Sequence, residues 1–256
     1  MLSISTFAST TWARENGCPS VTWRYGGGWD LRICQWAAAR GNLKVLIWAR
    51  EHGCPWEEDE PTDFQYNQLG ADWTLHCCAH AAEGGHLEVL KWLRCGSTTA
   101  CPWDQWTCAL AAEGGHLEVL KWARAHGCRW DMGDIACPPY DCAALAARGG
   151  HLDVLKWLQE QGFPWDHENT CASAATGGQL AVMKWLRANG CPWEEVVSVS
   201  LEWDCCAVDA SGGHLEVLKW LRANGCRWDK RVVQEAAWTG HDDVLQWALA
   251  NGCPTS

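Results

Sequence analysis

The sequence is poor in basic residues, in Phe and Tyr, and in long apolar runs. Lys and Arg number 20 against 31 Asp and Glu among 256 residues, so the formal net charge is −11. A protein that binds a phosphate backbone needs clustered Lys and Arg, so this balance argues against a nucleic-acid partner. No stretch reaches the roughly 18 consecutive apolar residues of a membrane span. The N-terminal segment MLSISTFAST lacks a basic start and a long apolar core, so we expect neither a secretory signal nor a membrane partner.

Motifs of common catalytic sites are missing as well. The sequence contains no Gly-x-Ser-x-Gly, no phosphate loop ending in Gly-Lys-Ser/Thr and no His-Glu-x-x-His. We therefore expect no enzymatic activity and no cofactor.

What the sequence does contain is an internal repeat rich in Trp and Cys. Trp occurs 21 times against 3 Phe and 3 Tyr, and Cys occurs 17 times. The string GGHLEVLKW occurs at 84–92, 114–122 and 212–220, and near copies lie at 40–48, 149–157, 177–185 and 239–247. Each copy is followed by Gly-Cys-Pro-Trp or a close variant. Self-similarity at this period is typical of a solenoid.

The recurring Trp divides the chain into units, with spacings between 27 and 44 residues. We predict a single repeat domain over 1–256, built from an N-terminal half unit and seven full units. The approximate boundaries are 1–19 for the half unit, then 20–55, 56–102, 103–129, 130–164, 165–192, 193–227 and 228–256.

Each unit is predicted to fold as two short antiparallel helices, which makes the fold all-α. Helix A is the Ala- and Cys-rich segment, for example Thr107 to Glu113, and Gly-Gly-His ends it. Helix B runs from Leu117 to about Ala125 and stops at Gly127, which suits a left-handed C-cap. Units differ in length mainly between the Pro-Trp and the next helix A. Such insertions map to loops on one edge of a solenoid.

The pattern Gly-His-Leu-Glu-Val-Leu-Lys-x-Leu-x-x-Asn-Gly resembles the second half of an ankyrin repeat, and the Ala-Ala before Gly-x-His resembles the end of that family's first helix. The resemblance covers essentially the whole chain and is closest to a divergent, Trp/Cys-rich type. Trp106-Thr107-Cys108-Ala109 stands near the place of the family's Thr-Pro-Leu-His signature, which is absent. The units of 27, 28 and 30 residues fall below the family's usual length, so tight loops can replace its hairpin fingers there.

Two columns of residues invite a chemical interpretation. His86, His116, His151, His214 and His241 share one column with Asn42 and Gln179, which are poor metal ligands, so a hydrogen bond to the neighbouring turn explains all seven. Cys recurs both in helix A and after helix B, and Ala, Val or Phe replaces it in some units. These substitutes indicate that the Cys side chains serve as small apolar groups in the core. Equivalent Cys in neighbouring units lie too far apart for a disulfide. Reduced thiols throughout would place the protein in an intracellular, reducing compartment, cytoplasm or nucleus.

One local cluster allows a metal site. His76 and His80 are four residues apart on helix A and share a face, and with Cys77 and a residue from the long loop they can hold zinc. Cys78 belongs to the buried column and no second ligand pair has zinc spacing, so a structural role is favoured and no metal is predicted.

The favoured function is a non-enzymatic scaffold that binds a partner protein, because a solenoid offers an extended concave face whose residues are free to vary. Five residues before the anchor glycine of each unit (41, 85, 115, 150, 178, 213, 240), helix A carries a variable column that matches the variable position of the family's first helix. The column consists of Trp36, His80, Leu110, Leu145, Ser173, Val208 and Glu235. We expect partner contacts there and on adjacent loops, with Trp73, Trp106 and Trp203 as candidate anchors.

Two alternatives stay open at this stage. One is a thiol-rich protein that binds zinc or responds to redox conditions. The other is the substrate-recognition part of a larger assembly, such as a ubiquitin-ligase adaptor, which rests on family analogy alone. The partner is unidentified, and a monomer is taken as the default.

Overall fold

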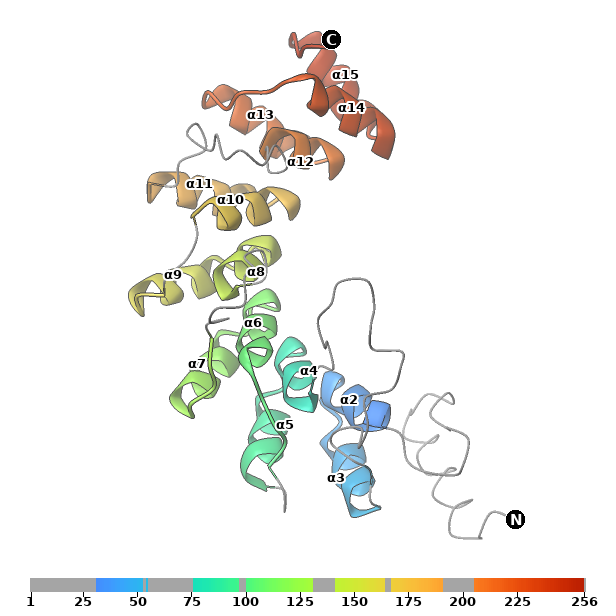
Figure 1. The fold of residues 1–256 in the computed structure, drawn as a ribbon, viewed down its shortest axis with the longest axis vertical. Coiled ribbons are helices and arrows are strands. Elements are labelled where there is room, and N and C mark those ends of the chain that lie inside the picture. The colour runs from blue at the N-terminus through green and yellow to red at the C-terminus, as the bar shows by residue number, and fades with distance from the viewer. Residues whose placement is uncertain are drawn as a thin grey trace, which may run out of the picture. The chain divides into compact units, whose positions relative to one another are not determined.

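The computed structural model describes residues 31–52, 54, 76–96, 100–130, 141–163, 167–190 and 205–255, and all regular elements in these ranges are helices (Figure 1). They fall into two compact units, Met1–Trp130 and Asp131–Ser256. The predicted all-α helical repeat fold is confirmed within each unit. The prediction of one continuous domain over the whole chain stays a prediction.

The described residues of the first unit form three helix pairs. Helix A is α2 (Leu31–Ala39), α4 (Cys77–Glu83) and α6 (Gln105–Glu113), and helix B is α3 (Leu43–Glu51), α5 (Leu87–Lys91) and α7 (Leu117–Ala125). A π-helical turn, η1 (Trp92–Gly96), lengthens α5 in the repeat that carries extra residues after its helix B. Successive A helices contact each other, α2 with α4 and α4 with α6, and α5 contacts α7. The pairs are therefore stacked in two layers.

The second unit, in its described residues, has four helix pairs of the same kind. Helix A is α8 (Cys142–Gly149), α10 (His167–Thr176), α12 (Cys205–Ser211) and α14 (Lys230–Thr239). Helix B is α9 (Leu152–Glu160), α11 (Leu180–Ala188), α13 (Leu215–Ala223) and α15 (Asp242–Ala250). The A helices again contact their neighbours in order, α8 with α10, α10 with α12 and α12 with α14. The described connections 101–104 and 226–229 contain no strand, as expected for tight loops in short units.

The core is built from small residues of helix A and aliphatic residues of helix B. The position three residues before the anchor glycine is Ala in all seven described repeats, and six of these alanines are buried. Val and Leu at the third and fourth positions of helix B, such as Val119 and Leu120, are buried against them. Small side chains let the helices approach closely, so the apolar surface that leaves water is continuous from one repeat to the next.

Successive repeats are joined by the His column. His86 Nε2 lies 3.1 Å from the carbonyl oxygen of Ala39 in the preceding repeat, and His116 Nε2 lies 2.9 Å from that of Glu83. Gln179 Nε2 donates to Arg148 O at 3.2 Å in the same way. The predicted structural role of this column, a hydrogen bond to the neighbouring turn, is confirmed at these residues.

Tryptophan lies at the boundary of the core. Trp103 and Trp122 are half-buried and meet edge to face, with ring centroids 6.0 Å apart, and the Arg94 guanidinium lies 4.2 Å from the Trp103 ring. Arg124 covers Trp130 at 3.9 Å in the next turn. Trp103 and Trp130 are each covered by an Arg of the preceding repeat, a contact worth about 0.5–1 kcal/mol at an exposed site.

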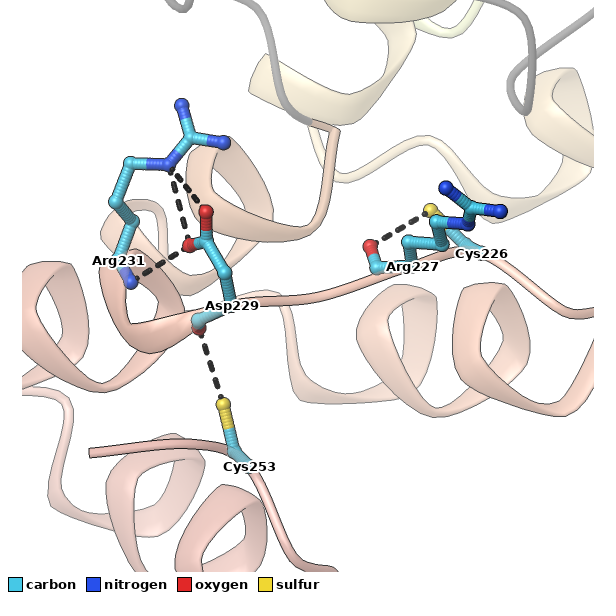
Figure 2. A network of polar contacts seen from close by, with 5 residues as sticks. All are labelled: Cys226, Arg227, Asp229, Arg231 and Cys253. Atoms are coloured by element: carbon cyan, nitrogen blue, oxygen red, sulfur yellow. Dashed lines mark hydrogen bonds and ion pairs between the residues drawn. The ribbon is translucent and has the colours of Figure 1, made fainter. Parts of the chain in front are cut away.

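The turn that precedes α14 shows how a helix A is started (Figure 2). Asp229 Oδ1 accepts a hydrogen bond from the backbone N of Arg231 at 2.8 Å and caps the helix, while Arg231 Nε lies 3.0 Å from Asp229 Oδ2. The Cys253 thiol donates to Asp229 O at 3.2 Å, which ties the end of the repeat to its beginning. Asp104 caps α6 in the same manner.

Candidate partner-binding surface

The predicted variable column lies on the helix-A layer of each unit. In the first unit it is contributed by α2, α4 and α6, and in the second by α8, α10, α12 and α14. Five of the seven residues are half-buried and reach solvent, namely Trp36, His80, Ser173, Val208 and Glu235. Leu110 and Leu145 differ, because they are only 8% and 3% exposed.

The two leucines therefore belong to the core in this structure. The repeat pattern carries no sign of this, since both occupy the same register as the exposed members of the column. Of the predicted Trp anchors, Trp106 is half-buried at the start of α6, and Trp73 and Trp203 lie outside the described residues. The acidic segment 57–63, EEDEPTD, which the sequence predicts to be part of a loop insertion, lies outside them too.

Two further columns share this face of helix A and were missed in the sequence. Residues nine, five and two positions before the anchor glycine are spaced i, i+4 and i+7, so they line one side of a helix. We call this set the helix-A face. The added members that reach solvent are Ala39, His76, Glu83, Glu113, Asp141, Arg148, Asn169, Thr176, Ser211, Arg231 and Trp238. The recognised column lies five residues before the anchor glycine. Steps of four residues back and three residues forward, as the helical period requires, would have identified the other two columns.

The chemistry of the helix-A face changes from repeat to repeat. In the first unit it carries His76, His80, Glu83 and Glu113 beside Trp106, and His80 Nδ1 lies 3.5 Å from Glu83 Oε2. In the second unit it is polar on α10 and ends on α14 with Trp238, which is 86% exposed. Because the packed positions beside it are small and uniform, this face can vary without disturbing the stack.

The zinc candidate is not assembled among the described residues. His76 lies just before α4, Cys77 is fully buried, and His80 faces Glu83. A hydrogen bond with Cys101, together with burial, raises the pKa of the Cys77 thiol well above its usual value, which disfavours the thiolate that zinc requires. No group of three potential ligands in the described part of the chain is placed to hold a metal ion.

The cysteines depart from the expectation that all thiols stand apart and reduced. The Cys34 thiol donates to Cys54 Sγ at 3.2 Å, and the Cys206 thiol donates to Cys226 Sγ at 3.1 Å. Cys171 is in a disulfide. The prediction considered equivalent Cys in neighbouring repeats, but the helix-A Cys and the Cys after helix B meet within one repeat. Reduced thiols throughout the chain were therefore a wrong premise at Cys171.

No helix in the part of the chain that the structure describes is both long and apolar enough to cross a membrane.

Comparison with known proteins gives a structural likeness only. No family model matches the chain. No curated protein sequence matches it either. Among solved structures, the ankyrin repeat domain of human ASB11 matches with 16% sequence identity and a TM-score of 0.50, covering 84% of this chain and 96% of that one. At that identity the match supports the fold, and the chain has an ankyrin-like helical repeat fold.

Proposed function

We propose that the protein is a non-enzymatic scaffold that binds a partner protein through the helix-A face and the adjacent loops. The observation that carries this proposal is the contrast between neighbouring columns of helix A. The column three before the anchor glycine is Ala in every described repeat, whereas the column two residues earlier holds Trp, His, Leu, Ser, Val and Glu. Packing explains the uniform column, and a surface available for recognition explains the varied one.

The solvent-accessible members are the expected contacts, and large amphipathic side chains among them are the expected anchors. Trp36, Trp106 and Trp238 offer rings with exposed area on otherwise small-residue helices. Trp is enriched among residues that dominate binding energy, because it buries much area with few rotatable bonds. Leu110 and Leu145 are proposed to support this face from beneath.

The negative charge around the helix-A face indicates which partner surfaces would be complementary to it. Glu83 and Glu113 lie on the helix-A face of the first unit, and the whole chain is acidic at a net charge of −11. A partner with a basic or mixed-charge surface around an apolar centre suits this face, since opposite charges raise the association rate. We further propose an intracellular, reducing compartment as the setting, cytoplasm or nucleus, because 13 cysteines of the described residues are thiols and not disulfides.

A pair of matched variants tests the proposal. The face variant combines His80→Glu, Ser173→Glu and Val208→Glu, all at half-buried positions of the helix-A face. The control variant combines Gln159→Glu, Ala181→Glu and Gln246→Glu, all at exposed positions of helix B. Both add three glutamates, and circular dichroism checks that both remain helical.

Proteins captured from source-cell lysate are then compared by mass spectrometry. A partner that binds the wild type and the control variant but is lost from the face variant supports the proposal. A partner that binds all three proteins equally contradicts the assignment to the helix-A face. Equal loss from both variants would mean that added negative charge, and not the location, decides binding.

A further inference from the structure

The two Cys columns meet inside single repeats, and this recurs through the described residues. Helix-A Cys lie seven residues before the anchor glycine, and their counterparts follow the turn after helix B. In two repeats the sulfurs are in direct contact, Cys34 with Cys54 at 3.2 Å and Cys206 with Cys226 at 3.1 Å. In a third repeat the Cys78 thiol donates to the backbone carbonyl oxygen of its counterpart Cys101 at 3.8 Å.

This placement is a consequence of how the repeat folds. The helix-A Cys lies in the first turns of its helix, and the second Cys begins the segment that returns to it. Cys54 N donates to Ala49 O at 2.9 Å and Cys226 N donates to Leu221 O at 3.0 Å, so the return has the same geometry in both repeats. Cys34, Cys54 and Cys206 are fully buried and Cys226 is 4% exposed. The sulfurs are thus held facing each other by backbone geometry.

We propose that these within-repeat thiol pairs, above all Cys34–Cys54 and Cys206–Cys226, are oxidation sites at which hydrogen peroxide forms a disulfide inside one repeat. A disulfide has a sulfur–sulfur distance of about 2.05 Å, so each pair needs to close by only about 1 Å. Cys171, which stands in the same helix-A column, is in a disulfide.

The reaction balances with peroxide as the oxidant. One thiolate sulfur attacks a peroxide oxygen, so an S–O bond forms, the O–O bond breaks and one water leaves after protonation. The partner thiol then attacks the sulfenic sulfur, so the S–S bond forms, the S–O bond breaks and a second water leaves. Two thiols are oxidised and one peroxide is reduced.

In two of these repeats the neighbouring thiols also favour the reactive form of one sulfur. Hydrogen bonds from the Cys77 and Cys78 thiols lower the pKa of Cys101 to about 4, and a bond from Cys108 lowers the pKa of Cys128. The same contact with Cys54, together with burial, raises the pKa of Cys34. At Cys101 and Cys128 the neighbouring thiols therefore favour the thiolate, which is the nucleophile of the first step.

The chain supplies its own comparison repeats. In the last repeat Val233 occupies the helix-A position, and the Cys253 thiol donates to Asp229 O at 3.2 Å (Figure 2), as the Cys128 thiol does to Asp104 O at 3.2 Å. In the fourth repeat the two positions are Ala143 and Phe163, which are both buried. A repeat therefore tolerates apolar residues at either position, so a variant that removes one thiol has a precedent in the same chain.

The test maps cross-links in the full-length protein. Reduced protein is treated with hydrogen peroxide or buffer, blocked with N-ethylmaleimide under denaturing conditions, cut with trypsin without reduction and examined by mass spectrometry. Trypsin leaves Cys226 alone in peptide 223–227, Cys206 in peptide 188–219 and Cys253 alone in peptide 232–256. Cys206→Val copies Val233, and Cys205→Val is the matched control at the adjacent residue.

We expect peroxide to convert most of peptide 223–227 into a cross-link with peptide 188–219 in the wild type and in Cys205→Val. The cross-link should disappear in Cys206→Val, and peptide 232–256 should carry none in any sample. Wild-type Cys226 that stays fully available to N-ethylmaleimide, or that is converted to sulfinic acid without cross-linking, overturns the proposal. A cross-link that survives in Cys206→Val, or is lost in Cys205→Val, overturns the assignment of the partner. Peptide 188–219 also carries Cys191 and Cys205, so fragmentation of the cross-linked peptide assigns the bonded sulfur in the wild type even if a variant fails to fold.

Discussion

The joint between repeats makes a specific prediction at Gly85. This residue has a positive φ of 73°, and a Cβ built on it would lie 2.5 Å from His116 Nδ1 of the next repeat. Gly127 has a positive φ of 86°, and a Cβ there would meet nothing within 4 Å. Ala at either position carries the same backbone strain, but only Gly85→Ala displaces the His116 ring.

The expected magnitudes separate the two variants. A non-glycine residue in the left-handed region costs about 1–2 kcal/mol, which is the whole expected loss for Gly127→Ala. Gly85→Ala adds about 1–3 kcal/mol for overpacking. It also loses the 2.9 Å contact between His116 Nε2 and Glu83 O, worth about 0.5–1.5 kcal/mol. We therefore expect Gly85→Ala to lower the free energy of unfolding by about 2–4 kcal/mol more than Gly127→Ala.

Urea denaturation followed by circular dichroism measures both losses, and a double-mutant cycle identifies their cause. In a His116→Ala background the ring is gone, so Gly85→Ala should cost no more than Gly127→Ala does in the same background. Equal losses for the two glycine variants in the wild-type background would refute the reasoning. So would an excess loss at Gly85 that persists without the His116 ring.

Three further predictions follow from contacts in the same repeats. Arg124→Ala should lower the free energy of unfolding, measured by urea denaturation, by about 1–2 kcal/mol, because Arg124 Nη1 donates to Cys128 O at 2.6 Å and the guanidinium covers the Trp130 ring. A change within experimental error would contradict the role given to the Arg124–Trp130 contact. Asp104→Ala should cost about 1 kcal/mol through the lost N-cap of α6, and Asp104→Asn, which keeps the acceptor, should cost less. Oxidation should raise the free energy of unfolding of the wild type by about 3 kcal/mol more than that of Cys206→Val, as expected for closing a loop of about 20 residues; equal gains in the two proteins would contradict a disulfide at that pair.

The helix boundaries were predictable because the repeat shows them several times over. The sequence placed helix A at Thr107 to Glu113 and helix B at Leu117 to about Ala125, and the structure has Gln105–Glu113 and Leu117–Ala125. Gly-Gly-His supplied the first stop and Gly127 the second, since glycine is the residue that adopts a positive φ without strain. The two-residue error at the start of α6 arose because Asp104, the cap, was not recognised.

The site and the thiol pairs were less accessible to sequence reasoning, for two physical reasons. Whether Leu110 or Val208 reaches solvent depends on how far neighbouring helices cover that register position, and the repeat pattern does not encode this. The contact between Cys206 and Cys226 depends on where the chain returns after helix B. A comparison along each column could not find it, because it joins two different columns.

The His joint also gives the array a direction. A repeat presents its ring at one end and its carbonyl oxygen and glycine at the other, as His116 does toward Glu83 and Gly85. A copied repeat would carry both the His ring and the carbonyl oxygen with its glycine. A duplicated copy inserted in register would therefore fit its neighbours without compensating changes. The contact between repeats then sets no limit on lengthening the chain by gene duplication. The limit comes from the exposed surface that each added repeat contributes.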